Sequence, residues 1–321
     1  MRTYVLRRLA LIVPTVFIVL VAVFVLIRMI PGDTVTLLLA DQNFTSQDED
    51  TLRHDLGLDK SIPAQFGEYF TDAIRLDFGE SLWTGKAVRH ELIVNRLPVT
   101  LELAGWALFF AIVIALPIGI ISAIRQDSWA DYLGRSVAIG GLAIPGFFLA
   151  TLAIILPARY IPEVYAKIGP PFAFEGPFSS VETNLRWFVL PGFLMGLVLA
   201  ASLMRMLRST MLETLRQDYV RTAWAKGLRE RTVITTHVLR NALIPVVTIL
   251  GLQIGTLIGG TVIYESIFGL PGIGTYFFSS ATRRDYPVLQ AVNIFLAAMI
   301  LTVNLVVDLS YTFLDPRIRY G

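Results

Sequence analysis

The residues best suited to act on another molecule lie in one basic segment, Glu213–Pro245. Positions 205–240 carry eight Lys and Arg residues against three acidic residues. Apolar side chains recur at helical spacing at Leu215, Tyr219 and Ala223, continuing a stripe that begins one turn earlier. This pattern predicts one amphipathic helix. An apolar stripe flanked by arginines suits docking to a partner, because the stripe supplies contact area and the charges set the register.

The rest of this segment predicts a compact knob. Gly227 fits a helix end, where a positive φ is favoured. A second short helix is expected at about Glu230–Arg240. Two short helices set at an angle would protrude from the surface as such a knob. The alternative explanation of the segment is that its positive charge serves only to fix membrane topology.

No catalytic, cofactor or metal site is expected. The chain has no cysteine, and its three histidines, His54, His90 and His237, lack ligand spacing. A Gly-x-x-x-x-Gly-Lys-Ser/Thr phosphate loop, a His-Glu-x-x-His pair and a Gly-x-Ser-x-Gly elbow are all missing from the sequence. Any ATP or Mg²⁺ used for work must therefore be bound by another chain.

The composition is that of an integral membrane protein. Of 321 residues, 55% are hydrophobic and only 16% are charged. Six apolar stretches reach the roughly 20 residues that a membrane helix needs, and the first is expected to be a retained anchor. They lie at Leu9–Ile30, Thr100–Ile124, Ser136–Ile161, Phe188–Met206, Ala242–Ile267 and Val288–Leu314.

The distribution of charge sets the expected orientation. With a cytoplasmic N-terminus, the inside segments hold 15 Lys and Arg residues in 62 positions, and the outside segments hold 11 in 121. Both termini are therefore expected in the cytoplasm, as is the basic segment. The predicted outside regions include 31–97, with a helix at Pro63–Leu76, and a Gly/Pro-rich turn at 268–274.

Small residues recur in the fifth span at Gly251, Gly255 and Gly259. This spacing lets helices approach closely. It indicates either a seam along a translocation path or ordinary packing within the chain. Polar residues such as Gln253 are expected to face protein or water, and Pro145 could kink the third span.

Several motifs together resemble one family. DYVRTAWAKGL, with Ala223 four residues before Gly227, looks like the "EAA" loop of ATP-binding-cassette importer permeases, and specifically the dipeptide/oligopeptide/nickel branch. The other matching stretches are LRRLALIVPT, RMIPGD, LGLDKSIPAQF, RLPVTLELA, ESIFGLPGIG, RDYPVLQ and LDPRIRYG. Arg221-Thr222-Ala223 replaces Glu-Ala-Ala, and Leu239-Arg240 replaces Leu-Pro, as is usual in the peptide branch.

The resemblance implies an all-α type I importer permease with six transmembrane helices. The expected divisions are a first span at 1–30, an extracytoplasmic helical region at 31–97, a permease core at 98–314 and a cytoplasmic tail at 315–321. Residues 208–240 would be the coupling loop to an ATPase chain. Its implied contact residues are Asp218, Tyr219, Arg221, Ala223, Lys226, Gly227 and Leu228.

The implied partners are a homologous second permease, two ATPase chains that bind ATP and Mg²⁺, and an extracytoplasmic binding protein. The expected location is a bacterial or archaeal plasma membrane, with no role for nucleic acid. Peptides are the expected solutes, and nickel complexes, glutathione and oligosaccharides remain alternatives. A stand-alone secondary transporter would predict inverted repeats and ionisable residues at the midplane. A membrane enzyme would predict clustered catalytic groups, and neither pattern is evident.

Overall fold

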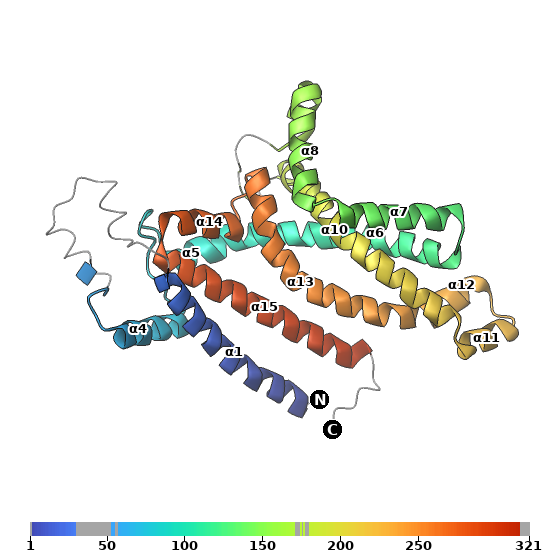
Figure 1. The fold of residues 1–321 in the computed structure, drawn as a ribbon, viewed down its shortest axis with the longest axis horizontal. Coiled ribbons are helices and arrows are strands. Elements are labelled where there is room, and N and C mark those ends of the chain that lie inside the picture. Colours follow the sequence, from blue (N-terminus) through green and yellow to red (C-terminus); the bar gives the residue numbers. More distant parts are fainter. Residues whose placement is uncertain are drawn as a thin grey trace. The chain divides into compact units, whose positions relative to one another are not determined.

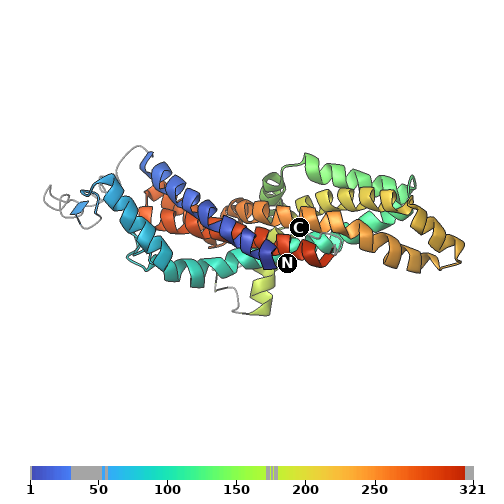
Figure 2. The ribbon, with the colours of Figure 1, turned by 90° about the horizontal axis from the view of Figure 1, so that it is seen from below.

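The computed structural model describes residues 2–29, 53–54, 57–170, 174, 176 and 180–314 (Figures 1 and 2). Within these residues the fold is all-α, as predicted, with one isolated antiparallel bridge between Glu80 and Ala87. Two compact units are present, one made of Met1–Val99 with Pro271–Thr302 and the other of Thr100–Leu270 with Val303–Gly321. Most of the 31–56 region and the tail at 315–321 lie outside the described residues.

The first unit is built on aromatic packing between two helices. Its helical segments are α1 (Arg2–Met29), α4 (Ile62–Arg75), α5 (Val88–His90), the π-helical η1 (Glu91–Arg96), α14 (Ile273–Arg283) and the first part of α15 (Tyr286–Leu314). The ring centroids of Phe24 on α1 and Phe66 on α4 lie 5.1 Å apart, edge to face. Tyr69 and Ala73 are buried in the same cluster. The helix predicted at Pro63–Leu76 is present, but its apolar face packs on α1 instead of forming a separate core.

A buried carboxylate fixes the start of α15. Asp285 is 2% exposed and accepts hydrogen bonds from the Ser81 hydroxyl at 2.6 Å and the Leu82 N–H at 3.3 Å. The indole of Trp83 donates to the Arg283 carbonyl at 2.9 Å. Burial raises the pKa of Asp285 above its usual range. These bonds tie the turn at 79–85 to the α14–α15 junction.

The second unit is organised around one long helix. It contains α6 (Leu97–Ile124) from Thr100 on, then α7 (Trp129–Ala143), α8 (Gly146–Tyr160), α9 (Pro162–Ile168), α10 (Val181–Leu215), α11 (Asp218–Ala225), α12 (Glu230–Thr232), η2 (Val233–Leu239) and α13 (Arg240–Phe268). Helix α10 packs against α7 and α13. Its side chains Phe188, Leu207 and Met211 are fully buried.

Two glycines set the approach of α10 to α6. A Cβ atom added to Gly192 would lie 2.5 Å from the Trp106 Cβ, and one added to Gly196 would lie 2.6 Å from the Ala107 carbonyl oxygen. No larger residue fits without a shift of the backbone. Gly192 and Gly196 have the small-xxx-small spacing of close helix contacts in membranes, yet the sequence reasoning placed the close contact on α13.

Within the described residues five of the six predicted spans each fall in a single helix, although the structure does not establish a count of six crossings. In the described part, four helical stretches are long and apolar enough to span a membrane, or five if α7 and α8 together form one. The N-terminal helix α1 contributes a shorter apolar stretch over Ile12–Leu26. The exact number of spans stays a prediction.

The span predicted at Ser136–Ile161 is not one continuous helix, and the kink predicted at Pro145 is present. The span is broken into α7 and α8, which meet at 90° (Figure 1). Ile144 is extended, with φ −96° and ψ 124°, and Pro145 has φ −58° and ψ 128°. A proline disfavours the helical region for the residue before it and supplies no N–H for the helix ladder, which accounts for the break.

Candidate functional site

The basic segment forms a knob beyond the end of α10, but as two pieces rather than one amphipathic helix. Helix α10 ends at Leu215, and Gln217 is extended with φ −73° and ψ 146° before α11 begins at Asp218. Leu215 and Tyr219 therefore lie on different helices. The predicted continuous stripe is wrong at this point because neither a Gly nor a Pro marks the break.

The second predicted short helix is also different from expectation. Residues 230–240 do not form a separate helix, because α12 passes through the π-helical η2 directly into α13. The helical stretch from Glu230 to Leu257 is continuous. A wide π-helical turn at this position thus joins the knob directly to a predicted membrane span, and such turns are frequent at functional sites.

Helix α11 is anchored by an apolar inner face. The buried residues of the knob are Val220, Ala223, Val233, Ile234 and Val238. Asn241 strengthens the anchor, since its Nδ2 donates to the Tyr219 hydroxyl at 2.9 Å and to the His237 carbonyl at 3.0 Å. Ala223, a predicted contact residue, is only 5% exposed and therefore supports the knob from within.

The outer face of the knob combines exposed charges with exposed apolar groups. The side chains of Asp218 and Arg221 are 97% and 74% exposed, with 3.6 Å between Arg221 Nη1 and Asp218 Oδ1. Trp224 is 43% exposed and Leu228 37% exposed. Such a surface can supply both contact area and register to a partner.

Gly227 closes α11 in the way predicted. Its φ is +74°, in the left-handed region, and a Cβ added there would meet no atom within 4 Å. The space around it is open, so the requirement for glycine comes from the backbone conformation alone. Lys226, just before it, is exposed.

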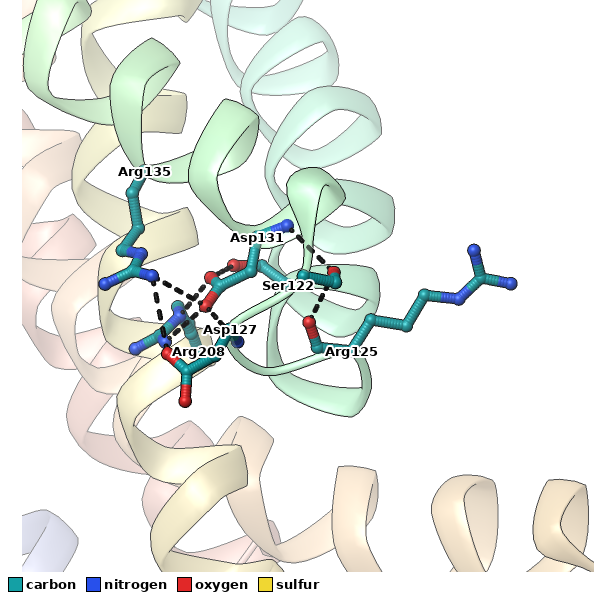
Figure 3. A network of polar contacts seen from close by, with 7 residues as sticks. Ser122, Arg125, Asp127, Asp131, Arg135 and Arg208 are labelled. Atoms are coloured by element: carbon teal, nitrogen blue, oxygen red, sulfur yellow. Dashed lines mark hydrogen bonds and ion pairs between the residues drawn. The ribbon is translucent and has the colours of Figure 1, made fainter.

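An ion-pair cluster clamps α7 to α10 within the second unit (Figure 3). Asp131 is fully buried and is bridged by Arg208, whose Nε and Nη2 lie 2.7 and 2.8 Å from the two carboxylate oxygens. The Ser122 hydroxyl and the Asp127 N–H also donate to Asp131. All four acceptor directions of the carboxylate are used, so breaking the pair would leave a buried charge without compensation.

This clamp connects the knob mechanically to the rest of the second unit. Arg208 lies seven residues before the end of α10 at Leu215, a distance of about 10 Å along the helix. The turn joining α6 to α7 is tied to the same carboxylate. The α6–α7 turn, α7 and α10 are therefore held together at this one carboxylate.

A cavity of about 440 Å³ lies among the α7–α8 elbow, α10 and α13. Its wall is mostly apolar, with neutral polar groups from Ser202, Gln253, Thr256 and Tyr264. The Gln253 amide donates to the Ser202 hydroxyl at 2.9 Å. Its Oε1 is buried with no hydrogen-bond partner in the part of the chain that the structure describes. Gln253 thus faces protein and cavity, as expected of a polar group in a span.

The predicted glycine seam on α13 is only partly packed within this chain. Gly251 is buried and Gly255 half-buried. Gly259 is exposed, and a Cβ added to it would meet no atom within 4 Å. On α10, Gly192 and Gly196 make close contacts with α6. Gly259, at the end of the α13 stripe, is thus not packed against the described residues.

The described residues hold no group of three or more His, Asp or Glu side chains suited to a metal ion. The sequence reasoning missed the Asp131–Arg208 clamp, since the two residues are 77 positions apart. The available signal was the position of the two residues. Asp131 lies next to the turn after the second predicted span, and Arg208 lies just after the fourth.

The fold and site define a polytopic α-helical membrane protein with a projecting basic knob. Two family models cover most of the chain: "binding-protein-dependent transport system inner membrane component" over residues 115–320, and the N-terminal component of the same systems over residues 1–104. The protein therefore belongs to the family of membrane components of binding-protein-dependent transport systems, and it is a permease subunit of a transport complex.

Curated relatives match over the full length. The chain is 38% identical to the dipeptide transport system permease protein of Alkalihalophilus pseudofirmus, covering 100% of both chains. It is 36% identical to the glutathione transport system permease protein of Pectobacterium atrosepticum, again over 100% of both. Among solved structures, a chain of the inward-facing MetNI methionine ABC transporter matches with a TM-score of 0.52 and 18% identity, covering 68% of this chain and 93% of that one. This likeness supports the fold.

Proposed function

We propose that the chain is the translocation subunit of an ATP-driven importer that takes up short peptides delivered by an extracytoplasmic binding protein. The observation that carries the proposal is full-length similarity to permeases named for dipeptide and glutathione transport. Glutathione is itself a small peptide, so both names point to the same solute class. The membrane would be the plasma membrane of a bacterium.

The proposed roles of this chain and of its ATPase partners rest on its missing phosphate loop and on the exposed outer face of the knob. Since the sequence has no phosphate loop, ATP and Mg²⁺ would be bound by two separate ATPase chains. The exposed face around Arg221, Trp224 and Leu228 would fit a groove on one of them. Closure of the ATPases would push α11, and the clamped helices α6, α7 and α10 would follow.

The cavity beside α13 suits a transient solute contact. Its volume of about 440 Å³ lies in the range of small-ligand pockets, and its described lining carries no charged side chain. Neutral hydrogen-bonding groups such as Gln253 can meet a peptide bond without holding it tightly, which permits release. A homologous second permease would complete the path along the exposed end of the Gly251, Gly255 and Gly259 stripe.

The test is uptake by the reconstituted transporter. Proteoliposomes holding the chain, its partner permease and its ATPases are supplied with the cognate binding protein and a panel of radiolabelled dipeptides, tripeptides, glutathione, nickel complexes and oligosaccharides. ATP-dependent accumulation of the peptides supports the proposal. Accumulation of sugars or nickel complexes alone would overturn the solute class, and accumulation without ATPases would overturn the energy source.

A further inference from the structure

Arg135 adds a second positive charge beside the Asp131–Arg208 pair. Asp131 has its four acceptor directions filled by Ser122, Asp127 and Arg208. The Arg135 Nη2 forms ion pairs with Asp131 Oδ2 at 3.2 Å and Asp127 Oδ1 at 3.6 Å, but among the described residues no group accepts a hydrogen bond from its Nε or Nη2. Buried guanidinium donors left in this state favour an additional acceptor.

A cavity of about 280 Å³ lies beside this cluster and is lined in part by Arg135. Its polar end is formed by Arg135 on α7 and by Arg205, Arg208 and Ser209 on α10. Arg205 is exposed and has no acidic partner in the described part of the chain. The three arginines of this cavity together with Asp127 and Asp131 carry a formal charge of +1. One phosphodiester, with a charge of −1, would neutralise it.

The other end of the same cavity is apolar. It is lined by Gly134, Ala138, Ile139 and Met204. On α7 the apolar residues lie one turn after Arg135, and on α10 Met204 lies one turn before Arg208. On α7 the apolar side chains Ala138 and Ile139 thus lie about 5–6 Å further along the helix than Arg135, whereas on α10 Met204 directly precedes Arg205. Ile139 is 68% exposed, so the apolar end is open to a chain lying beside it.

An aromatic ring marks the polar end as interfacial. The Arg135 guanidinium lies 4.6 Å from the ring centroid of Tyr132, which is half-exposed on the first turn of α7. Tyrosine is enriched at the level of lipid headgroups, and arginine is enriched in the cytoplasmic segments next to the membrane. Basic pockets between membrane helices on the cytoplasmic side are suited to acidic headgroups.

We propose that the cavity between α7 and α10 binds an anionic phospholipid. Its phosphate accepts hydrogen bonds from Arg135 and Arg205, and its acyl chains run past Ala138, Ile139 and Met204. The site is separate from the solute cavity and from the outer face of the knob. Because its cations adjoin the Asp131–Arg208 clamp, the bound headgroup stabilises the junction through which α11 is held.

The test compares retained lipid in matched arginine variants. The full chain, with the subunits that co-purify with it, is exchanged into nanodiscs of phosphatidylcholine containing a few per cent phosphatidylglycerol, and tightly held lipid is counted by native mass spectrometry. Removing one cation near the membrane surface weakens binding roughly fivefold, so we expect a fivefold loss in Arg135→Gln and roughly twentyfold in Arg135→Gln/Arg205→Gln. Arg125→Gln is the control, because its side chain is exposed and points away from the cluster (Figure 3).

Thermal unfolding separates lipid binding from a folding defect and from free phosphate. Relative to pure phosphatidylcholine, phosphatidylglycerol should raise the melting temperature of the wild type and of Arg125→Gln but leave that of the double variant unchanged. Equal retention of phosphatidylglycerol by all variants would overturn the proposal. It would also be overturned if inorganic phosphate alone, at millimolar concentration, gave the same stabilisation, because the apolar end of the cavity would then be irrelevant.

Discussion

Truncation of Trp224 on the outer face of the knob should weaken docking of an ATPase chain. The side chain is 43% exposed, and no described residue covers this part. A tryptophan buries up to about 250 Å² at an interface, so about 110 Å² remains available for a partner. At about 25 cal/mol/Å², that area is worth about 2.7 kcal/mol, or about 100-fold in affinity. Ordering costs reduce this value, and we expect a tenfold to hundredfold loss in Trp224→Ala.

The assay is direct binding of the purified ATPase chains to the permease pair held in nanodiscs, followed by ATP-dependent uptake. The matched control is Trp129→Ala, which removes a tryptophan that is 82% exposed at the start of α7. The control should bind ATPase as the wild type does. Thermal unfolding of both variants checks the fold, since Trp224 is also partly buried.

The reasoning would be refuted by an affinity within twofold of wild type in Trp224→Ala with the fold intact. It would equally be refuted if Trp129→Ala weakened binding as much. Either result would mean that the outer face of α11 is not the docking surface.

Three further substitutions test the packing that holds the site. Gly196→Ala would place a Cβ 2.6 Å from a backbone oxygen of α6 and should cost about 1–3 kcal/mol in the free energy of unfolding, whereas Gly259→Ala meets open space and should be near neutral, as read by chemical denaturation in detergent. Asp131→Asn should cost about 3 kcal/mol because it uncouples a buried ion pair, whereas Asp127→Asn, whose side chain is 66% exposed, should stay within about 0.5 kcal/mol. Burial raises the pKa of Asp285, so the folded state binds the proton more tightly than the unfolded state does. The contribution of this group to stability therefore falls as pH rises from about 4 through the raised pKa. A profile of melting temperature against pH should be flatter in that window for Asp285→Asn.

The spans were predictable because membrane helices are read from continuous apolar length, which requires no knowledge of neighbours. The α7–α8 break was signalled by Pro145, although its 90° size was not, because a proline inside a span can also be accommodated with little bending. Pro117 and Pro191 lie inside α6 and α10 without a break. Local sequence therefore indicated where bending was possible, while tertiary packing decided whether it occurred.

The details of the site were less predictable because they depend on contacts between distant residues. No Gly or Pro in the sequence marks the break at Gln217. Asp131 and Arg208 form an ion pair although they are 77 positions apart in the sequence. The residues around each of them do not indicate which side chain it pairs with. Similarly, Gly192 and Gly196 share the spacing of the α13 glycines, and only the packed structure shows that Gly192 and Gly196 meet α6 while Gly259 is exposed. Gly227 was predicted correctly because a positive φ at a helix end is a local requirement.

The most direct test of the central claim is site-specific cross-linking from the knob. Since the chain contains no cysteine, Arg221→Cys gives a single thiol that can carry a benzophenone maleimide. Irradiation of the assembled transporter should yield a covalent adduct of this chain with an ATPase chain, identified by mass spectrometry. Arg159→Cys, exposed at the far end of α8, should yield none. Failure of Arg221→Cys to form the adduct, or equal adduct formation by Arg159→Cys, would contradict the assignment of this knob as the ATPase docking site.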